Sequence, residues 1–228
     1  MRKSEDGFGK LRGEQSIVTS FASTDIIFFY DSGGALPVMF LTEQDMIFTL
    51  KSMGLNHQSK KLPDTFNGNA KLFEGYCRGE FLSLLYVKAK WGDYRKAITQ
   101  KNISNKFITD KLATHIHADH VLFRGCLKKE IYLSFNPWLL LIEVPAEANS
   151  AFGSLVERNL PHLEIGRTQP VTYLTPLQIF KLICVDMPKN KKHLKIIMKN
   201  IKIRLKSNPK LFTEIQYEIK KIEHFLKN

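Results

Sequence analysis

The sequence has few cysteines, and they are far apart. Cys77, Cys126 and Cys184 are the only three in 228 residues, and an odd number at such wide spacing does not form a disulfide framework. No Cys-x-x-Cys pair is present to clamp zinc. We therefore expect all three to behave as small buried hydrophobic residues in a reducing compartment.

Long hydrophobic runs are also missing. A membrane-spanning helix needs roughly 18 consecutive apolar residues, whereas the longest candidates, 26–30 and 138–142, are interrupted by Asp31 and Glu143. Residues 1–9 contain no hydrophobic stretch of the kind that forms a secretory signal. These absences predict a cytoplasmic protein with no membrane partner.

Acidic residues are scarce relative to basic ones. The chain has 34 lysines and arginines against 22 acidic residues, which gives a formal charge of +12 and a pI near 9.5. A surplus of this size attracts phosphate backbones or anionic lipid whatever the fold. With 43% apolar residues, the chain can bury the core of one large domain or two small ones.

The order of local patterns predicts an α+β fold. Residues 16–30 and 36–40 are expected to be strands on either side of a turn. Thr42 and Asp45 form a capping box for a helix that Gly54 closes. The polar connector 55–71 is the best internal boundary. We expect a mixed N-terminal segment (1–54), a central α+β region (72–174) and a helical, basic C-terminal region (175–228).

The central region alternates between buried and polar segments. Residues 80–89 are dense in large apolar side chains and must be buried, and residues 131–144 are expected to form one or two core strands. Helical spacing of apolar residues covers 147–160. Residues 161–174 return to a loop and a short strand.

The C-terminal region is expected to be helical. Thr175, a proline and Gln178 form a start signal. Residues 189–210 contain nine lysines and arginines and no acidic residue, and a last helix covers 210–226. In the basic segment one apolar stripe lies at helical intervals: Leu194, Ile197, Met198, Ile201 and Leu205.

A neighbouring face of this basic helix carries a row of lysines about 16 Å long, which matches several phosphates along a strand. Trp91 and Tyr94 also lie among cations, a mixture suited to stacking on bases. A solvated face or an anionic membrane surface are the alternatives. The residues predicted to bind DNA or RNA are Lys191, Lys192, Lys195, Lys199, Lys202, Arg204, Lys206, Trp91, Tyr94 and Arg95.

The segment His115-Ile-His117-Ala-Asp119-His120 is the one most suited to chemistry. In an extended chain, alternate side chains share a face, so His115, His117 and Asp119 would project together and His120 would join from the adjoining turn. Imidazole and carboxylate groups in this arrangement can hold a divalent metal such as zinc, iron or manganese. Such a metal can generate hydroxide or neutralise a phosphoryl oxygen.

This His-x-His-x-Asp-His pattern resembles the first metal-binding motif of the metallo-β-lactamase fold, which includes thiolesterases, sulfur dioxygenases and several nucleases. The resemblance implies that His115 and His117 bind one metal, and that Asp119 and His120 bind a second or assist the reaction. Residues 26–34 faintly resemble the earlier strand and Asp-x-Gly turn of that fold.

A second interpretation uses the same residues as a ββα-metal nuclease would. His120 would then activate water, Asp119 would bind the metal and Asn149 would orient the base. Glu157 or Asn159 would supply another ligand from the helix 150–160. In a third interpretation the segment holds no metal, its imidazoles are exposed or hydrogen-bonded, and Asp119 caps the next turn.

We therefore predict a nucleic-acid-binding protein whose histidine segment could add metal-dependent phosphodiester hydrolysis, with His120 and Asp119 as catalytic residues. One alternative is a non-catalytic nucleic-acid-binding subunit of a larger ribonucleoprotein or DNA-processing assembly, with other protein subunits as partners. Another is a metallo-β-lactamase-like hydrolase of a small substrate, for which the basic helix is incidental.

Overall fold

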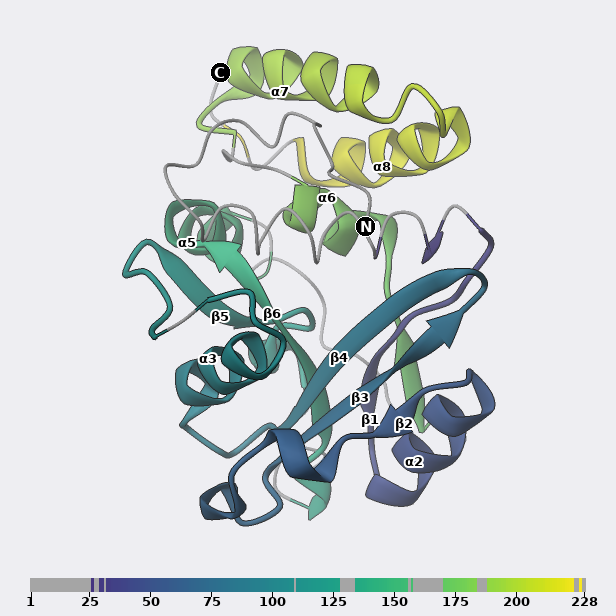
Figure 1. The fold of residues 1–228 in the computed structure, drawn as a ribbon. Helices are drawn as coiled ribbons and strands as arrows, with labels where there is room; N and C mark the ends of the chain where they lie inside the picture. The colour runs from purple at the N-terminus through teal and green to yellow at the C-terminus, as the bar shows by residue number, and fades with distance from the viewer. Residues whose placement is uncertain are drawn as a thin grey trace.

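The computed structural model describes residues 26, 29–30, 32–108, 110–127, 134–155, 157, 170–183, 188–223 and 226. These residues form helices and an antiparallel sheet, which confirms the α+β fold class (Figure 1). The strands are β1 (Pro37–Phe40), β2 (Asn56–His57), β3 (Ala70–Cys77), β4 (Glu80–Lys88), β5 (Ile116–His120), β6 (Trp138–Pro145) and β7 (Val171–Tyr173). The helices are α2 (Glu43–Ser52), α3 (Tyr94–Ser104), α5 (Ala146–Leu155), α6 (Pro176–Ile183), α7 (Lys191–Arg204) and α8 (Pro209–Ile222).

The sheet has the strand order β2-β3-β4-β6-β1-β7, and β5 pairs with β6 outside this path. The long hairpin of β3 and β4 turns at Arg78 and Gly79, both of which have positive φ. β6 is central, because its first residues pair with β4 and β1 and its second half pairs with β5. The histidine segment on β5 therefore lies beside the middle of the sheet.

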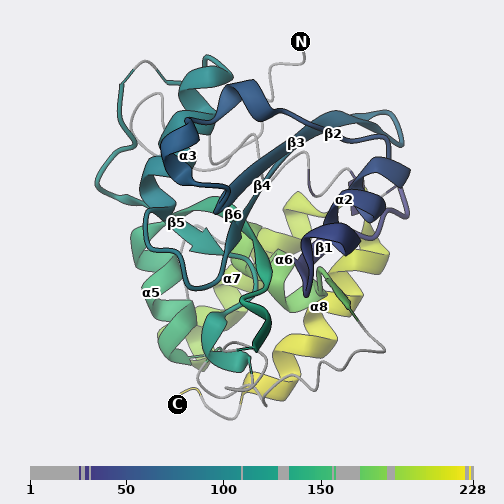
Figure 2. The same ribbon diagram turned by 90° about the horizontal axis from the view of Figure 1, so that it is seen from below.

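The sheet has a helical layer on each side. Side chains alternate along β6, so Leu141 packs with Ile116 of β5 and Ile98 of α3 in one buried cluster. Ile142 and Val144 belong to a larger cluster that includes the C-terminal helices. Figure 2 shows α3 on one side of β4 and β6 and α5, α6, α7 and α8 on the other.

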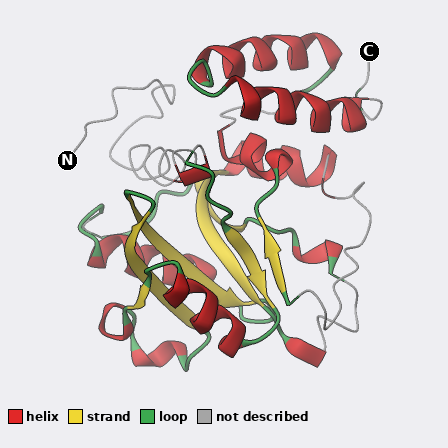
Figure 3. Ribbon diagram, turned by 90° about the vertical axis from the view of Figure 1, so that its right-hand side faces the viewer, coloured by secondary structure: helices red, strands yellow, loops and turns green. Residues whose placement is uncertain are grey.

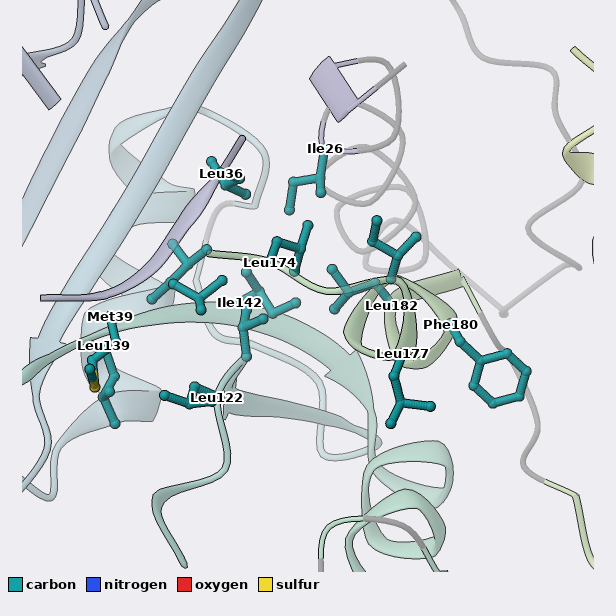
Figure 4. Packing of buried hydrophobic residues seen from close by; sticks show 14 of the residues in the cluster. Ile26, Leu36, Met39, Leu122, Leu139, Ile142, Leu174, Leu177, Phe180 and Leu182 are labelled. Carbon is teal, nitrogen blue, oxygen red and sulfur yellow. The ribbon is translucent and has the colours of Figure 1, made fainter. Parts of the chain in front are cut away.

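The larger core is centred on α6, which is apolar almost all round. Its side chains meet those of the sheet, as Figure 4 shows for Leu177 and Leu182 beside Ile142 and Leu174. A helix that is hydrophobic all round must be covered on several sides, and α5 and α8 contact it in addition to the sheet. Its buried apolar residues are Leu177, Ile179, Phe180, Leu182 and Ile183.

α2 and α6 begin where their capping residues predict. The Thr42 hydroxyl accepts a hydrogen bond from the backbone of Asp45 at 3.1 Å at the start of α2, and Gly54, with φ of +86°, follows its end. At α6 the backbone N–H of Thr175 donates to the Gln178 side chain at 2.9 Å. These contacts satisfy N–H groups that have no partner within the helix.

One predicted strand is wrong where the structure describes it. Ile26, Phe29 and Tyr30, from the segment 16–30, are helical. Their β-branched and aromatic side chains favour a strand, but β-propensity depends strongly on context. Ile26 and Phe29 are three residues apart, so a helical turn puts both on one side, where both are buried. The rest of that segment lies outside the described residues.

The connector 55–71 contains part of the sheet. It includes β2, which pairs with β3, and two 3-10 turns, Ser59–Lys61 and Asp64–Phe66. Since β1 also pairs with β6 and β7, the segments 1–54 and 72–174 contribute strands to the same sheet.

Every helix in the described part of the chain is too short or too polar to cross a lipid bilayer.

Candidate functional site

β5 separates the residues of the histidine segment. Its register with β6 places His117 and Asp119 on the side covered by α5 and α6. Ile116 and His120 face the opposite side, toward α3. His115 precedes the strand and is exposed. We expected His120 to join the others from a turn, but it is the last strand residue, and strand alternation turns it away from His117 and Asp119.

His120 lies in a largely apolar environment. Its ring meets that of Tyr94 edge-on, with centroids 4.4 Å apart, and its Nε2 is buried without a hydrogen-bond partner among the described residues. Burial, with the positive charges of Arg124 and Lys181, lowers the pKa of His120 to about 3. A general base works best with a pKa near the operating pH, so His120 is poorly suited to that role near neutrality.

On the other side of β5, Asp119 is paired with a buried lysine. Lys181 Nζ lies 2.5 Å from Asp119 Oδ2 and 2.7 Å from Glu157 Oε1, and its side chain is only 1% exposed. Burial alone would lower the pKa of Lys181, but the two carboxylates raise it above its usual value. Burial also raises the pKa of Glu157. The charged ammonium therefore joins β5, α6 and the segment after α5.

This arrangement does not suit the predicted metal centre. The Lys181 ammonium contacts the Asp119 carboxylate that would have to bind the metal, and it would repel a divalent cation there. Within the part of the chain that the structure describes, no three His, Cys, Asp or Glu side chains are grouped to hold a metal ion. The zinc, iron or manganese site implied by the metallo-β-lactamase resemblance does not fit these residues.

The ββα-metal interpretation meets the same obstacle. The Asn149 side chain lies 3.5 Å from Nδ1 of His117, on the opposite side of β5 from His120. Glu157 contacts Lys181, and Asn159 lies outside the described residues. Asn149 is therefore not placed to orient His120 as a general base.

A metal-binding measurement tests this interpretation of the segment. After incubation with zinc, iron or manganese and gel filtration, we expect elemental analysis to find well below one equivalent per chain, since Lys181 competes for Asp119. The His117→Ala variant should give the same value. A full equivalent that His117→Ala removes would contradict the expectation.

The predicted aromatic and basic contacts near α3 have structural partners. Trp91 packs against Phe66 with ring centroids 5.1 Å apart. Tyr94 packs against His120, and its hydroxyl accepts a hydrogen bond from Arg124 at 2.6 Å. The Arg95 guanidinium donates to three main-chain carbonyls of the segment 112–116, each at 2.5 Å. These three side chains are therefore engaged within the fold.

α7 lies at one end of the molecule, with α8 between it and α6 (Figures 1 and 3). Its N-cap residue, Asn190, accepts a hydrogen bond from the backbone of His193 at 2.8 Å. The predicted apolar stripe is confirmed, since Leu194, Ile197 and Ile201 are buried. Packing of this stripe fixes which side of α7 faces outward.

The outward side of α7 and the turn after it carry five exposed lysines, which we call the lysine row: Lys192, Lys195, Lys199, Lys202 and Lys206. Among the described residues, no carboxylate lies within 4.0 Å of any of these five ammonium groups. Lys191 is half-buried, and Arg204 donates to the carbonyl of Ile183 at 2.6 Å. These two predicted contacts are therefore not part of the row.

Two features of the structure were not predicted from the sequence. Ile196 and Ile203 are 54% and 66% exposed on the outward side of α7, and their positions outside the apolar stripe were the available signal. Lys181 is buried, and the signal there was one charge within an otherwise apolar helix.

No protein-family model, curated protein or solved structure matches this chain, so its function must be inferred from its own residues.

Proposed function

We propose that this protein binds nucleic acid through the lysine row of α7 and acts as a binding protein rather than as a nuclease. The observation that supports this is a helix whose apolar side is buried while its outward side carries lysines that have no carboxylate within 4.0 Å among the described residues. Like charges at these intervals repel one another. Phosphates along a strand would relieve that repulsion and release counterions.

The position of the row favours a phosphate backbone over a lipid surface. Amphipathic helices that bind membranes bury a broad apolar face that often includes Trp or Phe. The broad apolar face of α7 is already covered within the protein, and α7 contains no Trp or Phe.

Salt-dependent binding tests the proposal. We expect the protein to bind short duplexes in fluorescence anisotropy, with affinity that falls steeply as salt rises. Lys195→Gln/Lys199→Gln/Lys202→Gln should lower the affinity at least about tenfold and reduce the salt slope by about 2 to 3, since each lost phosphate contact removes about 0.9.

The control removes the same charge elsewhere. Lys51, Lys60 and Lys106 are exposed and lie outside α7, so Lys51→Gln/Lys60→Gln/Lys106→Gln changes the net charge by the same three units. This variant should retain nearly the wild-type affinity and slope. An equal loss of affinity in the two variants would show that the net charge of the protein, and not the lysine row, attracts the nucleic acid. Absence of binding at low salt would overturn the proposal.

A further inference from the structure

One exposed line of α7, beside the lysine row, is not basic. Ile196, Asn200 and Ile203 follow one another at intervals of four and three residues, so they share one line on the helix surface. All three are exposed, the isoleucines to 54% and 66%. Contact of an isoleucine side chain with water is unfavourable. Two isoleucines in line on one helix form an apolar edge that stays exposed in the folded protein.

The lysine row lies along one flank of this line. At about 100° per residue, Ile196 and Ile203 point almost directly away from the buried Leu194 and Leu205. The five lysines then follow on one side of the isoleucines. On the other side lies Arg204, which is anchored to the main chain of α6. α7 thus presents one basic flank and one apolar and amide edge.

We propose that α7 enters the major groove of duplex DNA, with Ile196, Asn200 and Ile203 toward the base edges and the lysine row on the phosphates of one strand. This inference rests on the proposed function and names its substrate. The major groove is about 12 Å wide and admits a helix. Asparagine pairs with the N6 and N7 atoms of adenine, and apolar groups contact the thymine methyl, so the line suits A·T pairs.

The same residues argue against other nucleic acids. The major groove of duplex RNA is too deep and narrow for side chains to read. Proteins that hold single strands stack bases on aromatic rings, and α7 contains no Phe, Tyr or Trp. From Ile196 to Ile203 the line covers about 10 Å, or about three base pairs.

Affinities for four ligands test the inference: an A·T-rich duplex, a G·C-rich duplex, a single strand and an RNA duplex. We expect the A·T-rich duplex to bind most tightly. Ile196→Ala/Ile203→Ala should weaken that binding by about tenfold and leave the salt slope unchanged, because base contacts release no counterions. Asn200→Ala should reduce the preference for A·T over G·C. Circular dichroism verifies that the variants remain folded.

The matched control is Ile47→Ala/Phe48→Ala on α2, which also removes two exposed apolar side chains and should bind as the wild type does. Normal binding by the isoleucine variant, or equal affinity of the wild type for all four ligands, would overturn the groove contact. In that case, weaker binding by the lysine variant would still support the proposed function. If the wild type binds none of the ligands, the proposed function fails as well.

Discussion

Replacement of Lys181 by methionine should lower the free energy of unfolding by about 3–5 kcal/mol, the usual cost of leaving a buried charge without its partner. The ammonium is the cation between Asp119 and Glu157, at 2.5 and 2.7 Å. Methionine fills a similar volume but also removes the cation–π contact with Phe152, whose ring centre lies 5.3 Å from Nζ. The two carboxyl groups would then face each other without an intervening charge. Urea unfolding followed by circular dichroism measures the loss.

Two controls separate the charge from the shape of the side chain. In the Lys181→Met background, Asp119→Asn/Glu157→Gln should recover most of the loss, because no buried charge remains in this cluster. Lys96→Met breaks the exposed pair with Asp93 and should change the unfolding free energy by less than about 1 kcal/mol. An unfolding midpoint for Lys181→Met equal to that of the wild type would show that the cluster does not contribute to stability.

The sequence predicted most of the C-terminal fold because its signals are local. Capping by Thr175 and the apolar spacing of Leu194, Ile197 and Ile201 act within one helix, so they can be recognised without tertiary information. The segment that includes Ile26 and Phe29 was predicted wrongly for the opposite reason. Its conformation is set by what its side chains contact, and those partners lie elsewhere in the chain.

The histidine segment shows the same limit at the level of a site. Alternation along a strand predicts that His117 and Asp119 share a face, and the register with β6 places them so. The alternation of side chains could not predict that Lys181, more than sixty residues later, contacts Asp119. Only the packing of α6 against the sheet brings that cation to the carboxylate. Four potential ligands close in sequence are therefore insufficient evidence of a metal site.

Because of His120, the free energy of unfolding should decrease as the pH falls. The pKa of His120 is about 3 in the folded chain and about 6.5 when unfolded, so between these values the unfolded state binds more protons. The contribution of neutral His120 is complete above pH 6.5 and is lost as the pH falls toward 3. Between pH 7 and pH 4 the loss amounts to about 3 kcal/mol.

The His120→Leu variant should lack this component, because leucine does not titrate and the position is buried beside Leu141, its partner on β6. Its unfolding free energy in urea should therefore fall less than that of the wild type between pH 7 and pH 4, whatever its value at pH 7. His115→Gln removes an exposed imidazole and should retain the wild-type slope. Parallel pH profiles for the wild type and His120→Leu would mean that His120 accepts a proton in the folded chain as readily as in the unfolded one. Its burial against Tyr94 would then have to open at acidic pH.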